Sequence, residues 1–250
     1  RNYVRSVHRE HAGDRWANRH TVATLRKAVS DPSAKLLSAI DEMRGHLVDD
    51  LALPTAPRRR VRRGLESGDE MDPDRWLVRN PYCWEQSQRE PQPRRTVTIG
   101  VNVTVYWAQE PEELLYRGAA ACALADVLTA RGLNVRILGL SVGSDCSSKV
   151  RKLVTTVELK RGDMPLDMAA LATAVCDVGF FRMIVMPAEF RHLPGAVDHG
   201  LGTRGNQSLP TADRRGIDYL IESDVTSREA AVKWLRGVVD NASQLNNPQA

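Results

Sequence analysis

The sequence predicts an α/β fold: a mostly parallel sheet with an antiparallel edge strand, helices on both faces, and an amino-terminal helical extension. Three observations support this prediction. From residue 96 onward strand-like apolar runs alternate with helical periods, two strand-like runs follow one another across a short turn, and helical spacing recurs within the first 53 residues. With 250 residues, of which 42% are hydrophobic, the chain can bury one substantial core.

Residues 1–53 are predicted to form a helical extension. Within them, apolar side chains recur at three- and four-residue spacing at Leu36, Leu37, Ile40, Met43 and Leu47. Because such a stripe needs burial, this helix is expected to pack on another element.

Residues 54–95 differ in composition, since they hold six of the 13 prolines and show little periodicity. We predict an extended connector here, with Trp76, Tyr82 and Trp84 as docked anchors. The third region, residues 96–250, is predicted to be the α/β domain.

In this third region we predict strands at 96–105, 133–142, 149–159, 180–187 and 217–223, and helices at 111–131, 165–179 and 226–242. The strands at 133–142 and 149–159 are separated by a polar segment too short for a crossover helix. They are therefore predicted to pair as an antiparallel hairpin, whereas the other strands should run parallel with helices between them.

This order of elements resembles the von Willebrand factor A fold, whose third strand runs antiparallel at the sheet edge immediately after the second. The resemblance covers about residues 96–240. It implies a metal-ion-dependent adhesion site, built from an Asp-x-Ser-x-Ser after the first strand, a Thr in a later loop and a further Asp. Such oxygen ligands suit a hard divalent cation.

Aligned with that pattern, Asn102, Thr104 and Tyr106 stand on the Asp-x-Ser-x-Ser positions. The loop "RGDMPLD" has no Thr where the family places one, but it contains two carboxylates. The resemblance therefore implies a degenerate adhesion site and no cofactor, with Mg²⁺ as the ion to test. Its candidate ligands are Asn102, Thr104, Asp163 and Asp167.

Arginine is concentrated in and around the connector. The candidate contacts to phosphate or to a partner are Arg58, Arg59, Arg60, Arg62, Arg63, Arg94 and Arg95. Such a run can bind phosphates or an acidic protein surface, or can keep a linker extended and solvated. No aromatic residue is interleaved with the arginines, as it is in most single-strand binders.

A long loop at 191–216 is a second candidate partner contact. Its polar candidates are His192, His199, Arg204, Arg214 and Arg215. The loop also matches G-x-G-x-x-G at 200–205, but no strand precedes this motif and no helix follows it. It is therefore not interpreted as a dinucleotide site.

The sequence shows no serine-hydrolase, P-loop, kinase or zinc-deaminase motif, and its four cysteines include no C-x-x-C pair. The leading hypothesis is a non-enzymatic interaction or structural assembly protein on a von Willebrand A-like scaffold. In this hypothesis the amino-terminal helices and the connector reach a protein partner or a neighbouring copy, in a larger, virus-like particle.

Two alternatives stay open at this point. One is a nucleic-acid-associated protein that uses the arginines at 58–63 for phosphates, and the other is a divalent-ion-dependent adhesion module. No apolar run of 18 residues and no signal segment occurs in the sequence. No membrane partner is therefore expected, and the expected location is the cytoplasm or an intracellularly assembled particle.

Overall fold

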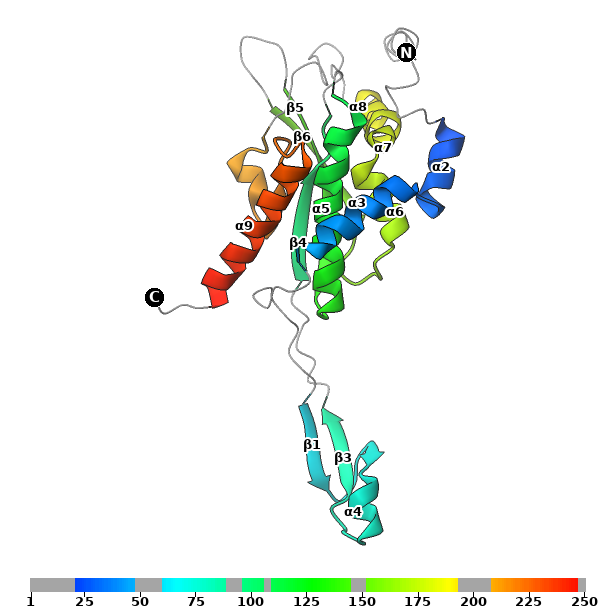
Figure 1. The fold of residues 1–250 in the computed structure, drawn as a ribbon, viewed down its shortest axis with the longest axis vertical. Coiled ribbons are helices and arrows are strands. Elements are labelled where there is room, and N and C mark those ends of the chain that lie inside the picture. Colours follow the sequence, from blue (N-terminus) through cyan, green and yellow to red (C-terminus); the bar gives the residue numbers. More distant parts are fainter. Residues whose placement is uncertain are drawn as a thin grey trace. The chain divides into compact units, whose positions relative to one another are not determined.

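The computed structural model describes residues 21–47, 60–88, 96–105, 109–144, 152–192 and 208–246. The chain divides into two units (Figure 1). Arg1–Pro54 and Thr96–Ala250 form the α/β domain, and Thr55–Arg95 form a second, small unit.

A four-stranded sheet lies at the centre of the α/β domain. Its strands are β4 (Thr96–Asn102), β5 (Asn134–Ser144), β6 (Lys152–Lys160) and β7 (Tyr219–Ile221), in the order β6-β5-β4-β7. β4 pairs in parallel with β5 and β7, whereas β6 runs antiparallel to β5 at the edge. The predicted hairpin and the mostly parallel sheet are thereby confirmed.

The helix α5 (Pro111–Ala130) packs on this sheet and is buried on all sides. Every residue at 117–125 is buried, a run of more than two helical turns. A helix that is apolar all round needs partners all round. The core cluster that contains α5 accordingly includes apolar residues of β4, β5, α3 (Ala34–Gly45), α6 (Met168–Cys176) and α9 (Arg228–Asn246).

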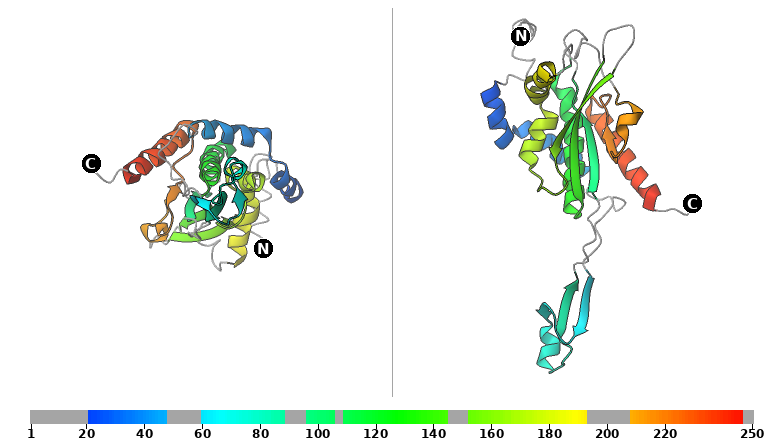
Figure 2. Two further views of the ribbon diagram at one scale, coloured as in Figure 1. Left: turned by 90° about the horizontal axis from the view of Figure 1, so that it is seen from below. Right: turned by 180° about the vertical axis from the view of Figure 1, so that it is seen from behind.

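The amino-terminal helices α2 (Val22–Ser30) and α3 supply part of that cover. α3 packs on α5, and α2 packs on α6; the left view of Figure 2 shows α3 outside α5. Met43 and Leu47 are fully buried, whereas Leu37 of the predicted stripe is 40% exposed. These described helices therefore form a layer of the α/β domain of the same chain, not an arm extending away from it.

The second face of the sheet has a smaller apolar cluster. Leu138, Leu140 and Val142 of β5 pack there with Leu209 and Ile217, from the segment that contains the 3₁₀ turn η2 (Thr211–Arg214). Helices were predicted on both faces, but among the described residues this irregular segment closes the second cluster. The physical reason lies in β4, which presents only small or polar residues to this face, at positions 98, 100 and 102.

The predicted strand at 180–187 is wrong. The chain forms α7 (Val178–Phe180), a π-helical turn η1 (Phe181–Val185) and α8 (Met186–His192). Phe181, Val185 and Glu189, each four residues after the last, are buried on one face. A short apolar run does not distinguish a buried strand from a buried helix, and here the spacing of four prevails.

The small unit contains a sheet where an extended connector was predicted. Its elements are β1 (Arg60–Leu65), β2 (Glu70–Met71), α4 (Pro73–Leu77) and β3 (Trp84–Gln88), with antiparallel strands in the order β1-β3-β2. Asp72 caps α4, accepting hydrogen bonds from the backbone N–H groups of Asp74 and Arg75. Pro73 suits the first helical position, where no N–H is needed.

Candidate functional site

The edge of the sheet where β4 and β7 end is the natural position for a ligand. The chain leaves β4 toward β5 on one side, and β7 lies on the other side, so this is a topological switch point. The side chain of Arg117 from α5 fills the position. Its guanidinium donates hydrogen bonds to four backbone carbonyls: Asn102 (2.6 Å), Ser223 (2.9 Å), Thr104 (3.1 Å) and Val225 (3.2 Å).

Arg117 is fully buried, and burial lowers the pKa of its guanidinium to about 10, although the nearby carboxylates of Glu113, Asp224 and Glu222 act in the opposite direction. The group therefore stays charged at neutral pH. At the edge where a von Willebrand A-like domain would hold a cation, this chain holds a positive charge of its own.

Glu222 forms a second centre at the same edge. Its carboxylate accepts hydrogen bonds from the backbone N–H of Leu209 (3.1 and 3.2 Å), from Arg214 Nη2 (2.7 Å) and from Asn102 Nδ2 (3.3 Å). Two residues from separate sequence predictions, Asn102 and Arg214, thus meet on one carboxylate. They connect β4 to the segment before β7.

Thr104 also has partners within the chain. Its backbone N–H donates to Asn102 Oδ1 (3.1 Å), and its hydroxyl oxygen accepts from the backbone N–H of Val142 (2.7 Å). Tyr106, the third aligned position, lies outside the described residues.

The two candidate carboxylates lie away from Asn102. Asp163 follows β6, beside Gly162, which lies against Thr96 and Asn134, the first residues of β4 and β5. The length of β4, about 20 Å for seven residues, therefore separates Asp163 from Asn102. Asp167 caps α6 by accepting from the backbone N–H of Ala170 (3.0 Å).

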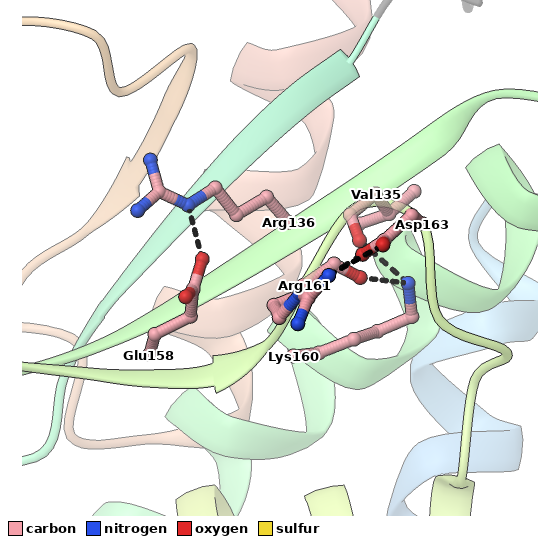
Figure 3. A network of polar contacts seen from close by, with 6 residues as sticks. All are labelled: Val135, Arg136, Glu158, Lys160, Arg161 and Asp163. Carbon is pink, nitrogen blue, oxygen red and sulfur yellow. Dashed lines mark hydrogen bonds and ion pairs between the residues drawn. The ribbon is translucent and has the colours of Figure 1, made fainter.

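Asp163 is paired instead with Arg161, at 2.6 Å (Figure 3). This hydrogen-bonded ion pair lowers the pKa of the Asp163 carboxyl. In the parts of the chain that the structure describes, no group of three or more His, Cys, Asp or Glu residues is arranged to hold a metal ion.

Figure 3 also shows how β5 and β6 are held together at the end of the sheet where β5 begins and β6 ends, opposite the switch point. Lys160 Nζ donates to the carbonyls of Val135 (2.6 Å) and Arg161 (3.0 Å), and Arg136 pairs with Glu158 at 2.6 Å. Burial lowers the pKa of the Lys160 ammonium. These contacts are structural, because each charged group already has a partner from the chain.

The remaining candidates of the long loop are dispersed. Arg214 is engaged by Glu222, Arg215 is exposed, and His192 is the last residue of α8. His199 and Arg204 lie outside the described residues.

Of the arginine cluster, three members lie on β1, at positions 60, 62 and 63. Arg63 Nε lies 3.1 Å from Glu85 Oε1 on β3. Arg58, Arg59, Arg94 and Arg95 lie outside the described residues. The arginines of β1 therefore belong to a strand of a folded unit and not to an unstructured linker.

The small unit also has an exposed apolar segment at 71–82 that the sequence reasoning missed. Its members are Met71 (40% exposed), Trp76 (58%), Leu77 (77%), Val78 (75%) and Tyr82 (49%). Trp76 and Tyr82 were predicted to be docked anchors, yet both are largely exposed. The signal in the sequence was the run "WLV" at the end of a helix too short to bury it.

Comparison with known proteins assigns the chain to a family. The model of the family described as "Domain of unknown function (DUF7192)" matches residues 1–242. This chain belongs to the DUF7192 family. No curated protein and no solved structure matches the chain significantly.

The match to DUF7192 spans both units, so the small unit lies within the family's extent. Within the described residues, no single helix of this DUF7192 chain has the length and apolar character needed to cross a membrane. One bent pair, Met168–Cys176 with Val178–Glu189 at 72°, has them by length and composition only.

A buried carboxyl, Glu189 of α8, was also missed, because the predicted strand at 180–187 ended before it and the helix that carries it was not predicted. It is 5% exposed, and it accepts hydrogen bonds from the hydroxyls of Ser141 and Thr155, which face each other on β5 and β6. Burial raises the pKa of Glu189, and the two hydroxyls act in the opposite direction. This carboxyl fastens α8 to the sheet.

Proposed function

We propose that this protein is a non-enzymatic assembly protein whose copies associate through the small unit. The observation that carries the proposal is the exposed apolar segment at 71–82. Of the eight large hydrophobic side chains that are exposed among the described residues, five belong to this segment. Concentrated apolar exposure marks interaction surfaces, and Trp and Tyr are enriched where interfaces bind most strongly.

The α/β domain would serve as the scaffold in this proposal. Its strand order agrees with the von Willebrand A-like resemblance: the antiparallel third strand lies at the edge, and the first strand lies between the second and the fourth. The switch-point edge supports a scaffold role, since Arg117 and Glu222 are bound there by groups of the same chain.

The test is light scattering after size exclusion, over a range of protein concentrations. We expect wild type to be larger than a monomer, and Leu77→Ser/Val78→Ser to shift it toward a monomer. Both residues are more than 70% exposed, so the substitutions should leave the fold intact.

The matched control is Ile184→Ser, which removes an exposed apolar side chain (42%) from the α/β domain. It should leave the association unchanged. A wild-type protein that stays monomeric at every concentration would contradict the proposal. Nucleic acid that co-purifies at low salt and is lost at high salt, with no self-association, would favour the phosphate-binding alternative.

A further inference from the structure

We propose that copies of this chain join head to tail through the two edges of the small sheet. The basic β1 edge of one copy lies beside the acidic β2 edge of the next. The inference rests on the proposed function, because it assigns the contact through which the copies associate.

Both edges of the small sheet are available for pairing. β3 lies in the centre and pairs with β1 on one side and β2 on the other. Among the described strands, β1 and β2 have no other partner. An edge strand directs half of its backbone N–H and C=O groups outward, and such a row is a template for a strand from another chain.

The charges of the two edges are opposite. β1 has arginine at three of its six positions, whereas the segment that contains β2 and enters α4 is acidic. Its carboxylates are Glu66, Asp69, Glu70, Asp72 and Asp74. Pairing of β1 with β1, or of β2 with β2, would bring like charges together, but pairing of β1 with β2 brings opposite charges together.

The register across the sheet shows where a cation is missing. Arg63, Glu85 and Glu70 stand opposite one another on β1, β3 and β2. Arg63 pairs with Glu85, but Glu70 is exposed and has no ion pair among the described residues. Two carboxylates directly opposite each other are unfavourable. A β1 arginine of the next copy, on the outer side of Glu70, would continue the alternation of charge.

The same contact accounts for the apolar exposure. Met71 is the last residue of β2, and α4 begins two residues later, so the exposed apolar segment starts at the acidic edge. A second copy seated on β2 would cover part of it. A partner of only one charge would be repelled by one of the two edges, whereas a second copy complements both. Because the two surfaces differ, the assembly grows into rings or filaments and does not stop at a two-fold dimer.

A charge swap tests this mode of pairing. One variant, Arg60→Glu/Arg62→Glu, reverses two charges of the basic edge, and the other, Asp69→Lys/Glu70→Lys, reverses two charges of the acidic edge. Arg63 is kept because it pairs with Glu85, and Asp72 is kept because it caps α4. The control Lys233→Glu/Arg236→Glu makes the same change of charge as Arg60→Glu/Arg62→Glu, but on exposed positions of α9.

Each edge variant alone should weaken self-association by about tenfold or more, and an equimolar mixture of the two should restore it. The α9 control should associate like wild type. Raised salt should weaken the wild-type assembly, because exposed charges are screened. If wild type associates but the mixture stays dissociated, or if Arg60→Glu/Arg62→Glu associates normally, head-to-tail pairing is overturned while assembly through the small unit stands. If wild type does not associate at all, the proposed function itself fails.

Discussion

Gly118 of α5 lies directly against the backbone of Val175 in α6. A Cβ placed at residue 118 would stand 2.5 Å from the carbonyl carbon of Val175 and 2.7 Å from the backbone nitrogen of Cys176. The two helices therefore approach at a distance that only glycine permits at this position. The contact holds α6 and the following helical segment beside the central helix.

We expect Gly118→Ala to destabilise the α/β domain by about 1–3 kcal/mol, because backbone has to move to admit the methyl group. Gly237→Ala is the matched control, since Gly237 lies in α9 with nothing near its missing Cβ. It should stabilise by about 0.5–1 kcal/mol through helix propensity. Urea denaturation of both variants measures the difference. Equal effects would contradict the close approach of α5 and α6.

Arg117→Met removes the donors of four buried carbonyls. Because an unsatisfied buried acceptor costs about 1–3 kcal/mol, we expect a total loss of about 2–4 kcal/mol after relaxation and removal of the buried charge. Arg44→Met is the control, since Arg44 makes an exposed ion pair with Asp126 at 3.1 Å. That variant should change the free energy of unfolding by less than about 1 kcal/mol. A stable Arg117→Met protein would show that the guanidinium is dispensable at this edge.

The burial of α3 on α5 predicts two different outcomes within one helix. Met43→Ala should cost about 2–5 kcal/mol, because Met43 is fully buried in the main core. Leu37→Ala, at a 40% exposed position, should change stability by about 0.5 kcal/mol or less. Thermal unfolding distinguishes them. Similar small effects at both positions would mean that α3 does not cover α5 in solution.

Glu189 should make stability depend on pH in an unusual direction. Burial raises the pKa of Glu189 in the folded protein above its value in the unfolded chain. The contribution of this carboxyl to the free energy of unfolding is therefore complete below the unfolded pKa and is lost as pH rises through the folded pKa. Glu189→Gln cannot ionise. We expect it to raise Tm at pH 7 by about 2–4 °C, with the gain shrinking toward pH 4.

Glu229→Gln is the control for this pH profile. The pKa of Glu229, in the first turn of α9, is lowered by hydrogen bonds to the backbone and to Ser227. Its contribution is therefore present above the unfolded pKa and is lost as pH falls. At neutral pH the Tm of Glu189→Gln should lie above that of wild type, and the Tm of Glu229→Gln should lie below it. If the Tm of both variants changed with pH in the same way, this result would be inconsistent with a buried Glu189.

Mg²⁺ should leave Tm unchanged. Asp163 is separated from Asn102 by the length of β4, and Asp167 is engaged in capping α6. A ligand that binds the folded state raises Tm by mass action, so a Mg²⁺-dependent rise that EDTA reverses would revive the adhesion-site alternative.

The elements predicted well are those specified by neighbouring residues. The spacing at 34–47 predicted α3, and the short polar turn predicted the β5–β6 hairpin. The strand predicted at 180–187 failed because a short apolar run fits either a buried strand or a buried helix. The sheet of the small unit was missed because its segment is rich in proline and arginine and lacks the apolar alternation that predicts a strand. In addition, β2 is only two residues long.

The candidate site was predicted less well, because its contacts join residues far apart in sequence. Arg117 of α5 meets carbonyls more than a hundred residues away, at 223 and 225, and nothing in "LLYRGAA" distinguishes it from a solvated arginine. Asp163 seemed a partner for Asn102 because the resemblance put both in one site. The direction of the strands instead puts Asp163 beside the first residue of β4, whereas Asn102 is the last residue of that strand.

The sequence by itself determined the periodic elements, the hairpin and the charge of each segment, since these depend on residues within a few positions of one another. The tertiary structure decided which surfaces meet. It put α3 over α5, a guanidinium at the switch point and arginines on the outer strand of the small sheet, because burial and strand pairing are set by contacts between distant segments.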